Sequence, residues 1–493
     1  MARHNITARP SIIIIGTGFG GLGMAIQLKK AGFMDVTLLE KAGRVGGTWR
    51  DNTYPGAACD VQSHFYSYSF EPKHNWSRKF GLQHELLGYM EHCVEKYDLA
   101  EQIRFNCEVA EAVFDSRHNN WALTLTTSET LEAQVVITAT GQLNQPAMPD
   151  IEGMDDFKGT CFHSARWNHE YDLKDKRVAV IGTGASAIQF VPEIAGKAES
   201  LALFQRSAAW VLPKPDRPFK KWEQSLFKAI PAWDRLYRNL IYWKNESRGL
   251  AFTRFSGLLS IFARQARSEA RRHVTDPEKI KHIIPDYQIG CKRILISNDW
   301  YPAINRSNVD LVTSPIEKIV STGVQTRSGK HYPVDAIIFG TGFRASEFLS
   351  PIRVTGRSGL TLNEAWKDGA VAFKGITVSG FPNLFMLYGP NTNLAHNSIL
   401  YMLESQFRYV LSCLTALQKY PGSAMDVRKD RLERYSSVIQ NGLEGSVWSS
   451  GCSSWYLDAN GKNTLNWPGF TFSYRFSTRS VDTADYQFLY PRE

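Results

Sequence analysis

Two segments of the chain repeat one plan, and this repeat limits the fold more than any other feature of the sequence. The first segment, residues 11–41, reads SIIIIGTGFGGLGMAIQLKKAGFMDVTLLEK, and the second, residues 177–207, reads RVAVIGTGASAIQFVPEIAGKAESLALFQRS. In each, a short β-branched run predicts a buried strand, glycines predict a turn into a helix, and a second apolar run predicts another strand. The repeat therefore predicts an α/β protein with two Rossmann-like folds, each of which binds one dinucleotide.

The first copy has three glycines at the spacing that dinucleotide-binding turns require. Gly16 permits the tight turn, Gly18 lets backbone amides approach a pyrophosphate, and Gly21 lets the helix pack closely on the strand. The start of the following helix offers free N–H groups to the phosphates. Glu40 follows the next strand, where a carboxylate can accept hydrogen bonds from ribose hydroxyls. We expect these four residues to bind a dinucleotide; the alternative is a glycine-rich turn without a ligand.

The second copy keeps the turn but changes the charge at the ribose end. It fills the same pattern with Gly182, Gly184 and Ala187. Arg206 lies 24 residues after Gly182, which is the offset of Glu40 in the first copy. An arginine attracts a 2′-phosphate and can bind it bidentately, whereas a carboxylate repels it. With Ser207 as a further hydroxyl donor, we expect NADPH rather than NADH; the alternative is that Arg206 is a solvated surface charge.

The composition is that of an ordinary globular protein. The chain has 493 residues, of which 43% are hydrophobic and 21% are charged, and it is long enough to bury more than one core. The polar start, residues 1–10, does not resemble a secretory signal, and no stretch approaches the ~20 apolar residues of a membrane span. The net charge of +9 comes without a recognised nucleic-acid motif. We therefore expect a cytoplasmic protein that has no membrane span and no nucleic-acid partner.

The cysteines argue against a disulfide scaffold and against a zinc site. They are seven, an odd number, and they form no CxxC pair. This pattern fits a reducing compartment. We therefore expect no disulfide framework and no metal site among Cys59, Cys93, Cys107, Cys161, Cys291, Cys413 and Cys452.

A helical, basic and aromatic insertion is expected at residues 215–289. Its sequence WEQSLFKAIPAWDRLYRNLIYWK has apolar residues at roughly helical spacing. One interpretation is a helical lid whose aromatic side packs on the core. The other is peripheral contact with a membrane surface.

Two further segments resemble a known family. Residues 46–60, GGTWRDNTYPGAACD, match the pattern of type I Baeyer–Villiger monooxygenases: Gly-Gly-x-Trp, four residues, Tyr-Pro-Gly, three residues, Asp. Residues 157–168, FKGTCFHSARWN, match the family fingerprint FxGxxxHxxxW followed by Pro or Asp. The matching residues are Phe157, Gly159, His163 and Trp167, while Asn168 departs from the pattern. The related flavin-containing monooxygenases, which oxidise nitrogen and sulfur, have Tyr or Phe in place of the tryptophan, so Trp167 favours the first family.

The resemblance covers nearly the whole chain and implies a domain plan. Further similar blocks are GCKR at residues 290–293, FPNLFMLYGPNTNLAHN at residues 381–397, and residues 448–456. The plan comprises a discontinuous FAD-binding domain, an NADP-binding domain and the helical insertion. Their expected ranges are 1–145 with 346–493, 146–214 with 290–345, and 215–289.

The resemblance also implies the reaction. NADPH reduces FAD, and the reduced flavin captures dioxygen as a peroxide at flavin C4a, which attacks a ketone to give an ester or a lactone. Holding that anion requires a fixed positive charge in a dry site, and arginine suits this because it stays protonated. Arg293 matches the catalytic arginine of the family, and Asp60 matches the aspartate that orients it. The alternative for this pair is a structural salt bridge, and Lys292 is expected at the NADP 2′-phosphate or ribose.

The remaining expectations concern cofactor contacts and competing activities. We expect Thr48, Trp49, Asp60 and Ser186 near the cofactors, and a hinge role for the second fingerprint, His163 and Trp167 included. Trp49 and Tyr54 could equally belong to the core. The competing functions are oxidation of nitrogen or sulfur through the same flavin chemistry, electron transfer by a reductase or oxidase, and a flavin-binding sensor. The sequence leaves the preferred ketone, the regioselectivity and the oligomeric state open.

Overall fold

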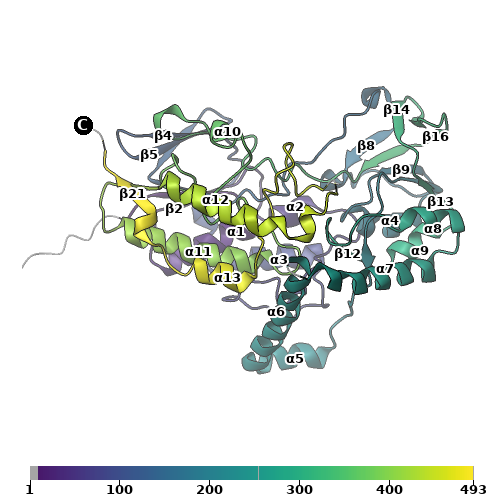
Figure 1. Cartoon of the computed structure of the whole chain (residues 1–493), viewed down its shortest axis with the longest axis horizontal. Coiled ribbons are helices and arrows are strands. Elements are labelled where there is room, and N and C mark those ends of the chain that lie inside the picture. Colours follow the sequence, from purple (N-terminus) through teal and green to yellow (C-terminus); the bar gives the residue numbers. More distant parts are fainter. Residues whose placement is uncertain (1–8, 254, 453, 492–493) are drawn as a thin grey trace, which may run out of the picture.

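The computed structural model describes residues 9–253, 255–452 and 454–491. Two parallel sheets, each flanked by helices, lie in the two halves of the molecule, and a pair of helices stands out below them (Figure 1). Parallel sheets covered by helices define an α/β architecture. The expectation of an α/β fold with two Rossmann-like units is therefore confirmed.

The first sheet is built around the N-terminal glycine-rich turn. All of its strand pairs are parallel, and its order is β19-β7-β1-β2-β3. The strands are β1 (Ile12–Ile15), β2 (Val36–Leu39), β3 (Ile103–Arg104), β7 (Val135–Thr138) and β19 (Leu384–Met386). Strand β19 comes from the C-terminal part of the chain, so the two ends of the chain share this sheet.

The second sheet repeats the first in the same order. Read from the matching edge, its parallel strands run β8-β17-β9-β10-β13, so β9 takes the place of β1 and β10 takes the place of β2. The strands are β8 (Thr160–His163), β9 (Arg177–Ile181), β10 (Ser200–Phe204), β13 (Val309–Val312) and β17 (Ala336–Phe339). A Thr-Gly turn follows β7 at residues 140–141, and another follows β17 at residues 341–342. These two turns also occupy matching places, each beside a glycine-rich turn.

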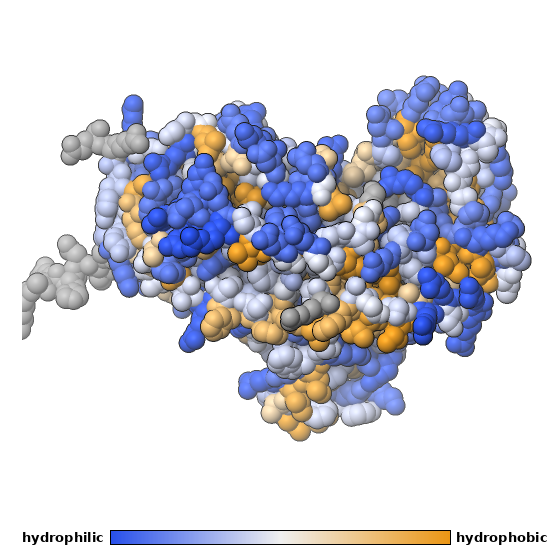
Figure 2. All heavy atoms as spheres, in the orientation of Figure 1, coloured by the Kyte–Doolittle hydropathy of each residue, from blue (hydrophilic) through white to orange (hydrophobic). Residues whose placement is uncertain are grey.

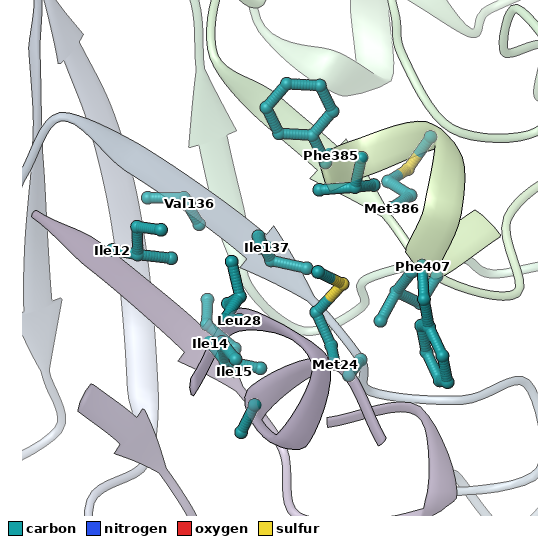
Figure 3. Packing of buried hydrophobic residues seen from close by; sticks show 14 of the residues in the cluster. Ile12, Ile14, Ile15, Met24, Leu28, Val136, Ile137, Phe385, Met386 and Phe407 are labelled. Atoms are coloured by element: carbon teal, nitrogen blue, oxygen red, sulfur yellow. The ribbon is translucent and has the colours of Figure 1, made fainter. Parts of the chain in front are cut away.

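The core of the first unit lies between its sheet and two helices. Helix α1 (Phe19–Lys30) follows β1, and α11 (Ile399–Leu417) packs against α1. Ile14 and Ile137 meet Met24 and Leu28 of α1 in this layer (Figure 3). All four residues of β1 are buried, because a central parallel strand is covered on both faces. In the second unit, α4 (Ala187–Ala195) takes the place of α1.

A small antiparallel sheet is inserted at the same point of each unit. In the first unit it lies between β3 and β7 in the chain, and in the second between β13 and β17. The first comprises β4 (Val109–Asp115), β5 (Asn120–Leu125) and β6 (Thr130–Ala133), which pair antiparallel. A fourth strand from later in the chain, β18 (Arg353–Thr355), pairs parallel with β4. The second comprises β14 (Ile316–Val320), β15 (Gly323–Thr326) and β16 (His331–Pro333). The two units therefore resemble each other in this inserted sheet as well as in the glycine-rich motif that the sequence repeats.

The expected helical insertion is present, and one of its helices is apolar on two sides. It contains α5 (Lys221–Ala229), α6 (Pro231–Thr253), α7 (Leu259–His273) and α8 (Pro277–Ile283). One side of α6 packs on the body of the protein through Ile241 and Tyr242, as the lid interpretation expected. That interpretation is wrong for Trp222, Trp233 and Trp243, which lie exposed.

The remaining elements connect and border these units. The helices are α2 (Thr48–Asp51), α3 (Gln83–Lys96), α9 (Trp300–Ile304), α10 (Leu362–Ala365), α12 (Lys429–Glu444) and α13 (Thr471–Ser477). The strands are β11 (Val211–Leu212), β12 (Leu295–Ile296), β20 (Ala424–Val427) and β21 (Tyr486–Leu489). Among the helices of the described ranges, none combines the length and the apolar character that crossing a bilayer requires.

Candidate active site between the two nucleotide-binding folds

One large cavity of about 1100 Å³ runs between the two units and collects most of the predicted site residues. Strand ends and turns of both sheets form its walls, which is where ligands bind in parallel α/β sheets. Its predicted lining residues are Gly16, Gly18, Glu40, Thr48, Trp49, Asp60, Gly182, Gly184, Ser186, Arg206, Ser207, Lys292 and Arg293. Gly21 and Ala187 lie behind this surface, where helix packs on strand.

The two glycine-rich turns bring the backbone very close to the neighbouring Thr-Gly turn. Gly16 and Gly182 have φ of +105° and +113°, a region that side chains rarely adopt. A Cβ on Gly16 would lie 2.7 Å from the Ala139 carbonyl oxygen, and one on Gly182 would lie 2.4 Å from that of Gly340. Only glycine fits at either place, so the turns follow directly from the sequence.

The second glycine of each motif, Gly18 or Gly184, faces the open cavity. A Cβ on Gly184 would meet no atom within 4 Å, and the nearest atom to one on Gly18 lies 4.0 Å away. Neither α1 nor α4 has a side chain that caps its first N–H groups, so these donors remain for a ligand. The space and the free donors fit a dinucleotide pyrophosphate at each turn.

Glu40 is held at the ribose end of the first turn. Its Oε2 accepts hydrogen bonds from Thr17 Oγ1 at 2.6 Å and from the Thr17 amide at 3.1 Å. Its Oε1 accepts from Arg50 Nη1 at 2.6 Å. Burial alone would lower the pKa of Arg50, but the hydrogen bonds to Asp51 and Glu40 raise it above its ordinary value. Arg50 is a site residue that the sequence analysis missed, although it lies inside the first fingerprint.

The register of the second sheet corrects the expected match between Arg206 and Glu40. Ile15 pairs with Leu39, and in the second unit Ile181 pairs with Phe204. The residue that follows β2 is therefore Glu40, and the residue that follows β10 is Gln205. The equal offsets of Glu40 and Arg206 from the first glycine of each motif suggested the wrong match, because the chain from β9 to β10 is one residue shorter than the chain from β1 to β2. Gln205 is buried and donates to the His282 carbonyl at 2.7 Å, while the next residue, Arg206, is exposed towards the cavity.

Arg206 shares its part of the cavity with Ser207 and Lys292. Lys292 Nζ donates to Ser207 Oγ at 3.1 Å and lies 4.6 Å from the centre of the Tyr287 ring. Burial and the nearby Arg206 guanidinium lower the pKa of Lys292 below its ordinary value of 10.5. Two cations beside a hydroxyl suit a phosphate dianion, whose charge would offset their mutual repulsion.

Arg293 and Asp60 form an ion pair in the wall of the cavity. Arg293 Nε donates to Asp60 Oδ2 at 3.2 Å, and Nη2 donates to the same oxygen. Each side chain is about one-third exposed, 32% for Arg293 and 33% for Asp60. Asp60 raises the pKa of Arg293 despite burial, which keeps the guanidinium charged. Burial alone would raise the pKa of Asp60, but Arg293 holds it below its ordinary value, so the carboxyl stays ionised.

Several side chains around this pair were not singled out from the sequence. Lys214 stands near Asp60, and burial lowers its pKa. Tyr388 donates from its hydroxyl to Asn393 Oδ1 at 2.7 Å, and burial raises its pKa. Burial also raises the pKa of Tyr456 to about 12, although the Arg293 charge opposes this. Tyr388, Asn393 and Tyr456 lie in blocks that resemble the family, which was the only signal for them.

The first fingerprint forms a joint with the second unit. Tyr54 donates from its hydroxyl to Gln189 Oε1 at 3.0 Å, and Gln189 Nε2 donates to the Ala58 carbonyl at 3.0 Å. Gly56 has φ of +78°, and a Cβ there would lie 2.7 Å from the backbone oxygen of Gln189. The Tyr-Pro-Gly segment thus docks its backbone directly on α4, the helix that follows the second glycine-rich turn.

The second fingerprint reaches the same joint from the other side. The Trp167 ring packs on Phe190 at 5.3 Å, and Phe190 packs on Tyr54 at 5.9 Å between ring centres. His163 ends β8 and packs its ring on Phe343 of the cavity wall, 5.9 Å between ring centres, and burial lowers its pKa. Asn168 Oδ1 accepts from the Glu170 amide at 3.0 Å, a turn contact that an aspartate would make equally well.

A disulfide between Cys291 and Cys452 corrects the expectation drawn from the cysteine count. The two residues are 161 positions apart, and their Cα atoms lie 6.3 Å apart. The bond ties the segment that holds Lys292 and Arg293 to the C-terminal loop that precedes Tyr456. No spacing rule connects such distant cysteines, so the sequence alone did not reveal the pair.

The comparisons with known proteins agree with this geometry. Two dinucleotide folds that face one cavity beside a fixed cation define a two-cofactor oxidoreductase, and a family profile described as pyridine nucleotide-disulphide oxidoreductase matches residues 13–230. The chain is 45% identical over 477 residues to the Baeyer–Villiger monooxygenase of Pseudomonas aeruginosa, covering 96% of this chain and 90% of the relative. It is 44% identical to the Baeyer–Villiger monooxygenase of Streptomyces coelicolor, covering 100% and 95%.

Solved structures show the same likeness. An oxidized steroid monooxygenase bound to NADP has a TM-score of 0.87 and 30% identity, covering 98% of this chain and 100% of that one. A complex of OTEMO with FAD and NADP has a TM-score of 0.88 and 27% identity, with the same coverage. The chain belongs to the Baeyer–Villiger monooxygenase family.

Proposed function

We propose that Arg293 and Asp60 form the catalytic centre at which this FAD- and NADPH-dependent monooxygenase converts ketones to esters or lactones. The overall reaction consumes a ketone, dioxygen, NADPH and a proton, and it yields the ester or lactone, NADP⁺ and water. The observation that carries the proposal is a guanidinium with a raised pKa in the wall of a cavity that two dinucleotide-binding turns share.

Each unit offers a site for one cofactor. The first turn, with Gly16, Gly18 and Glu40, would hold FAD, and the second, with Gly182 and Gly184, would hold NADPH. Arg206, Ser207 and Lys292 would bind the 2′-phosphate of NADPH. Thr48, Trp49 and Ser186 line the same cavity and would complete these contacts. When bound, the cofactors supply the electrons that reduce dioxygen.

Arg293 would stabilise negative charge on oxygen during the reaction. Nucleophilic attack on a ketone converts its carbonyl oxygen into an oxyanion, and a fixed cation stabilises that charge without reorganisation. Because Asp60 raises the pKa of Arg293, the guanidinium does not lose its proton to the reacting oxygen. Arg293 is therefore assigned as the catalytic residue.

Asp60 would act as the positioning residue. Both hydrogen bonds that it accepts from Arg293 end on one oxygen, which restricts how the guanidinium turns. The fingerprints would serve as the joint between an FAD domain of residues 1–145 and 346–493 and an NADP domain of residues 146–214 and 290–345. Tyr54 and Trp167 meet at α4 in support of this division, and His163 and Phe157 with Gly159 would belong to the hinge.

The Arg293→Ala variant tests the catalytic assignment. We expect product formation from cyclic and linear ketones to fall by roughly 10²–10³-fold, the usual effect of removing one charge-stabilising donor. Flavin content and the rate of flavin reduction by NADPH should stay within about threefold of wild type. Arg428→Ala, which removes an exposed arginine that does not line the cavity, serves as the matched control.

Two outcomes would contradict the assignment. If Arg293→Ala formed ester at the wild-type rate, the guanidinium would have no role in the oxygen transfer. If it instead failed to bind FAD, its role would be structural. Parallel product analysis with a sulfide shows whether the variant loses ketone oxidation selectively.

A further inference from the structure

Helix α6 presents a second apolar face that nothing in the described chain covers. Its body-facing side is formed by buried residues such as Ile241 and Tyr242. On the opposite side, residues three, four or seven positions apart form an exposed stripe, because those spacings place side chains on one helix face. The stripe consists of Trp233, Leu236, Leu240, Trp243 and Leu250.

The stripe belongs to the part of the molecule that projects from its body. Helix α5 and the start of α6 extend below the two units, and hydrophobic side chains gather at the tip of this projection (Figures 1 and 2). Trp222 on α5 is 62% exposed, and Trp243 and Leu240 on α6 are 59% and 58% exposed. Single exposed apolar residues are ordinary, but a contiguous group of this kind marks a surface that binds something.

Helices α5, α6 and α7 with their connections carry nearly all of the net positive charge. Residues 220–273 contain twelve Lys and Arg against four Asp and Glu, a net charge of +8, while the whole chain has +9. Exposed cations stand on both projecting helices, namely Lys221, Lys228, Arg235, Lys244 and Arg248. The projection therefore combines an apolar stripe with a strongly basic surround.

The four carboxylates of this segment are all engaged within the protein. Glu223 pairs with Arg217, Glu269 pairs with His273, and Asp234 lies buried beside His64 and His74. Glu246 is buried on the inner side of α6 and accepts from Asn397 Nδ2 and Thr471 Oγ1. These carboxylates do not offset the cations on the outer face, which therefore has a positive potential.

We propose that α5 and α6 bind the surface of a membrane that contains anionic phospholipids. Tryptophan rings and leucines enter the interfacial region, while Lys and Arg side chains remain beside the lipid phosphates. Each Lys or Arg near an anionic leaflet strengthens the binding. The charge pattern favours this partner over a second copy of the chain, because two such projections would repel each other.

Sedimentation of the full-length holoenzyme with lipid vesicles tests the proposal. Vesicles of phosphatidylcholine alone are compared with vesicles that also contain phosphatidylglycerol, each at about 0.1 M and about 0.5 M salt, because screening weakens surface charge interactions. We expect at least about fivefold more bound enzyme on the anionic vesicles at low salt, and loss of most of that binding at high salt.

Two variants separate the apolar and the charged contributions. A triple change of Trp233→Ser, Leu240→Ser and Trp243→Ser should reduce binding at least about tenfold. Lys221→Gln, Lys228→Gln and Lys244→Gln together should remove the preference for anionic lipid. The matched control replaces exposed apolar residues elsewhere, Met34→Ser, Leu360→Ser and Val438→Ser, and should bind like wild type. Unchanged flavin absorbance shows that each variant is folded.

The proposal is overturned by either of two results. One is equal sedimentation of the wild type and the triple serine variant with anionic vesicles. The other is a wild-type protein that does not bind vesicles but forms a dimer in lipid-free solution, where the triple serine variant is a monomer. The stripe would then be the contact between two copies of the chain. Tryptophan fluorescence gives an independent readout, because insertion of Trp233 or Trp243 should shift emission to shorter wavelength.

Discussion

The two nucleotide-binding units share a backbone plan and differ at their ribose ends. Both sheets have the same strand order, and both turns begin with a glycine at positive φ pressed against a neighbouring carbonyl. After β2, however, the first unit has the carboxylate Glu40, and after β10 the second unit has neutral Gln205 followed by Arg206. On the proposed assignment, recognition of pyrophosphate would rest on backbone geometry that both units share, whereas the choice of cofactor would rest on one or two side chains.

The third position of the motif shows a second difference. A Cβ on Gly21 would lie 1.9 Å from the Gly16 carbonyl oxygen, so the first unit accepts only glycine there. The second unit has Ala187, whose side chain is buried against Gly340. The second unit therefore accommodates a Cβ at this place, and the two motifs tolerate different residues at equivalent places.

The largest effect should come from exchanging these third residues. Gly21→Ala forces a severe clash between helix and strand, so we expect at least about 100-fold weaker FAD binding, which corresponds to ~2.8 kcal/mol. The measurement is the flavin-to-protein absorbance ratio after purification and dialysis. The reciprocal change, Ala187→Gly, should leave flavin content unchanged and NADPH oxidation within about twofold. Normal flavin content in Gly21→Ala would contradict the packing difference.

The next largest effect should come from removing the cation of the second unit. Arg206→Ala should raise KM for NADPH by roughly 10–100-fold, because charge-assisted hydrogen bonds contribute about 1.5–3 kcal/mol. KM for NADH, which lacks the phosphate, should change less than about twofold. Arg327→Ala, an exposed arginine on another part of the same unit, provides the control. Equal increases for both nucleotides would show that Arg206 does not contact the 2′-phosphate.

A smaller effect is expected at the joint between the units. Tyr54→Phe removes the hydroxyl that donates to Gln189 and retains the ring that packs on Phe190. Loss of one hydrogen bond, worth about 1 kcal/mol, should reduce kcat by about two- to fivefold without changing flavin content. Steady-state kinetics with saturating NADPH measure the change. A kcat equal to wild type would show that this contact does not organise the two units for turnover.

The smallest effect should be a pH dependence of NADPH binding. The pKa of Lys292 is lowered, so the ammonium loses its proton as the pH rises towards 10.5, earlier than an ordinary lysine. Attraction for the 2′-phosphate is therefore complete at neutral pH and weakens at alkaline pH. We expect KM for NADPH to rise a few-fold across this alkaline range, and Lys292→Arg, which stays charged, to abolish the rise. A pH-independent KM in wild type would contradict the role of Lys292.

The sequence predicted the parts of the site that depend on local chain geometry. Glycine turns after short β-branched strands predicted both folds, because Gly16 and Gly182 satisfy a backbone requirement that few other residues meet. The resemblance predicted that Asp60 and Arg293 act together, and the structure brings them into contact although 233 positions separate them. The helical insertion was also predicted from spacing alone.

Other features depend on tertiary packing and were not readable from the chain. Equal offsets suggested that Arg206 matches Glu40, but a connection one residue shorter shifts the register to Gln205. The Cys291–Cys452 bond requires two loops to meet in space, which no spacing encodes. The aromatic residues of α6 looked like core residues, because helical periodicity does not tell which of two apolar faces is covered.

The buried carboxylate of Glu246 sets a condition for anyone who recombines these proteins. It accepts hydrogen bonds from the Thr471 amide and hydroxyl and from Asn397, while His396 lies 3.5 Å away. These partners come from the C-terminal third of the chain. A chimera whose α6 comes from a relative must also have matching residues at positions 396, 397 and 471. Without them, a buried charge is left without hydrogen-bond partners.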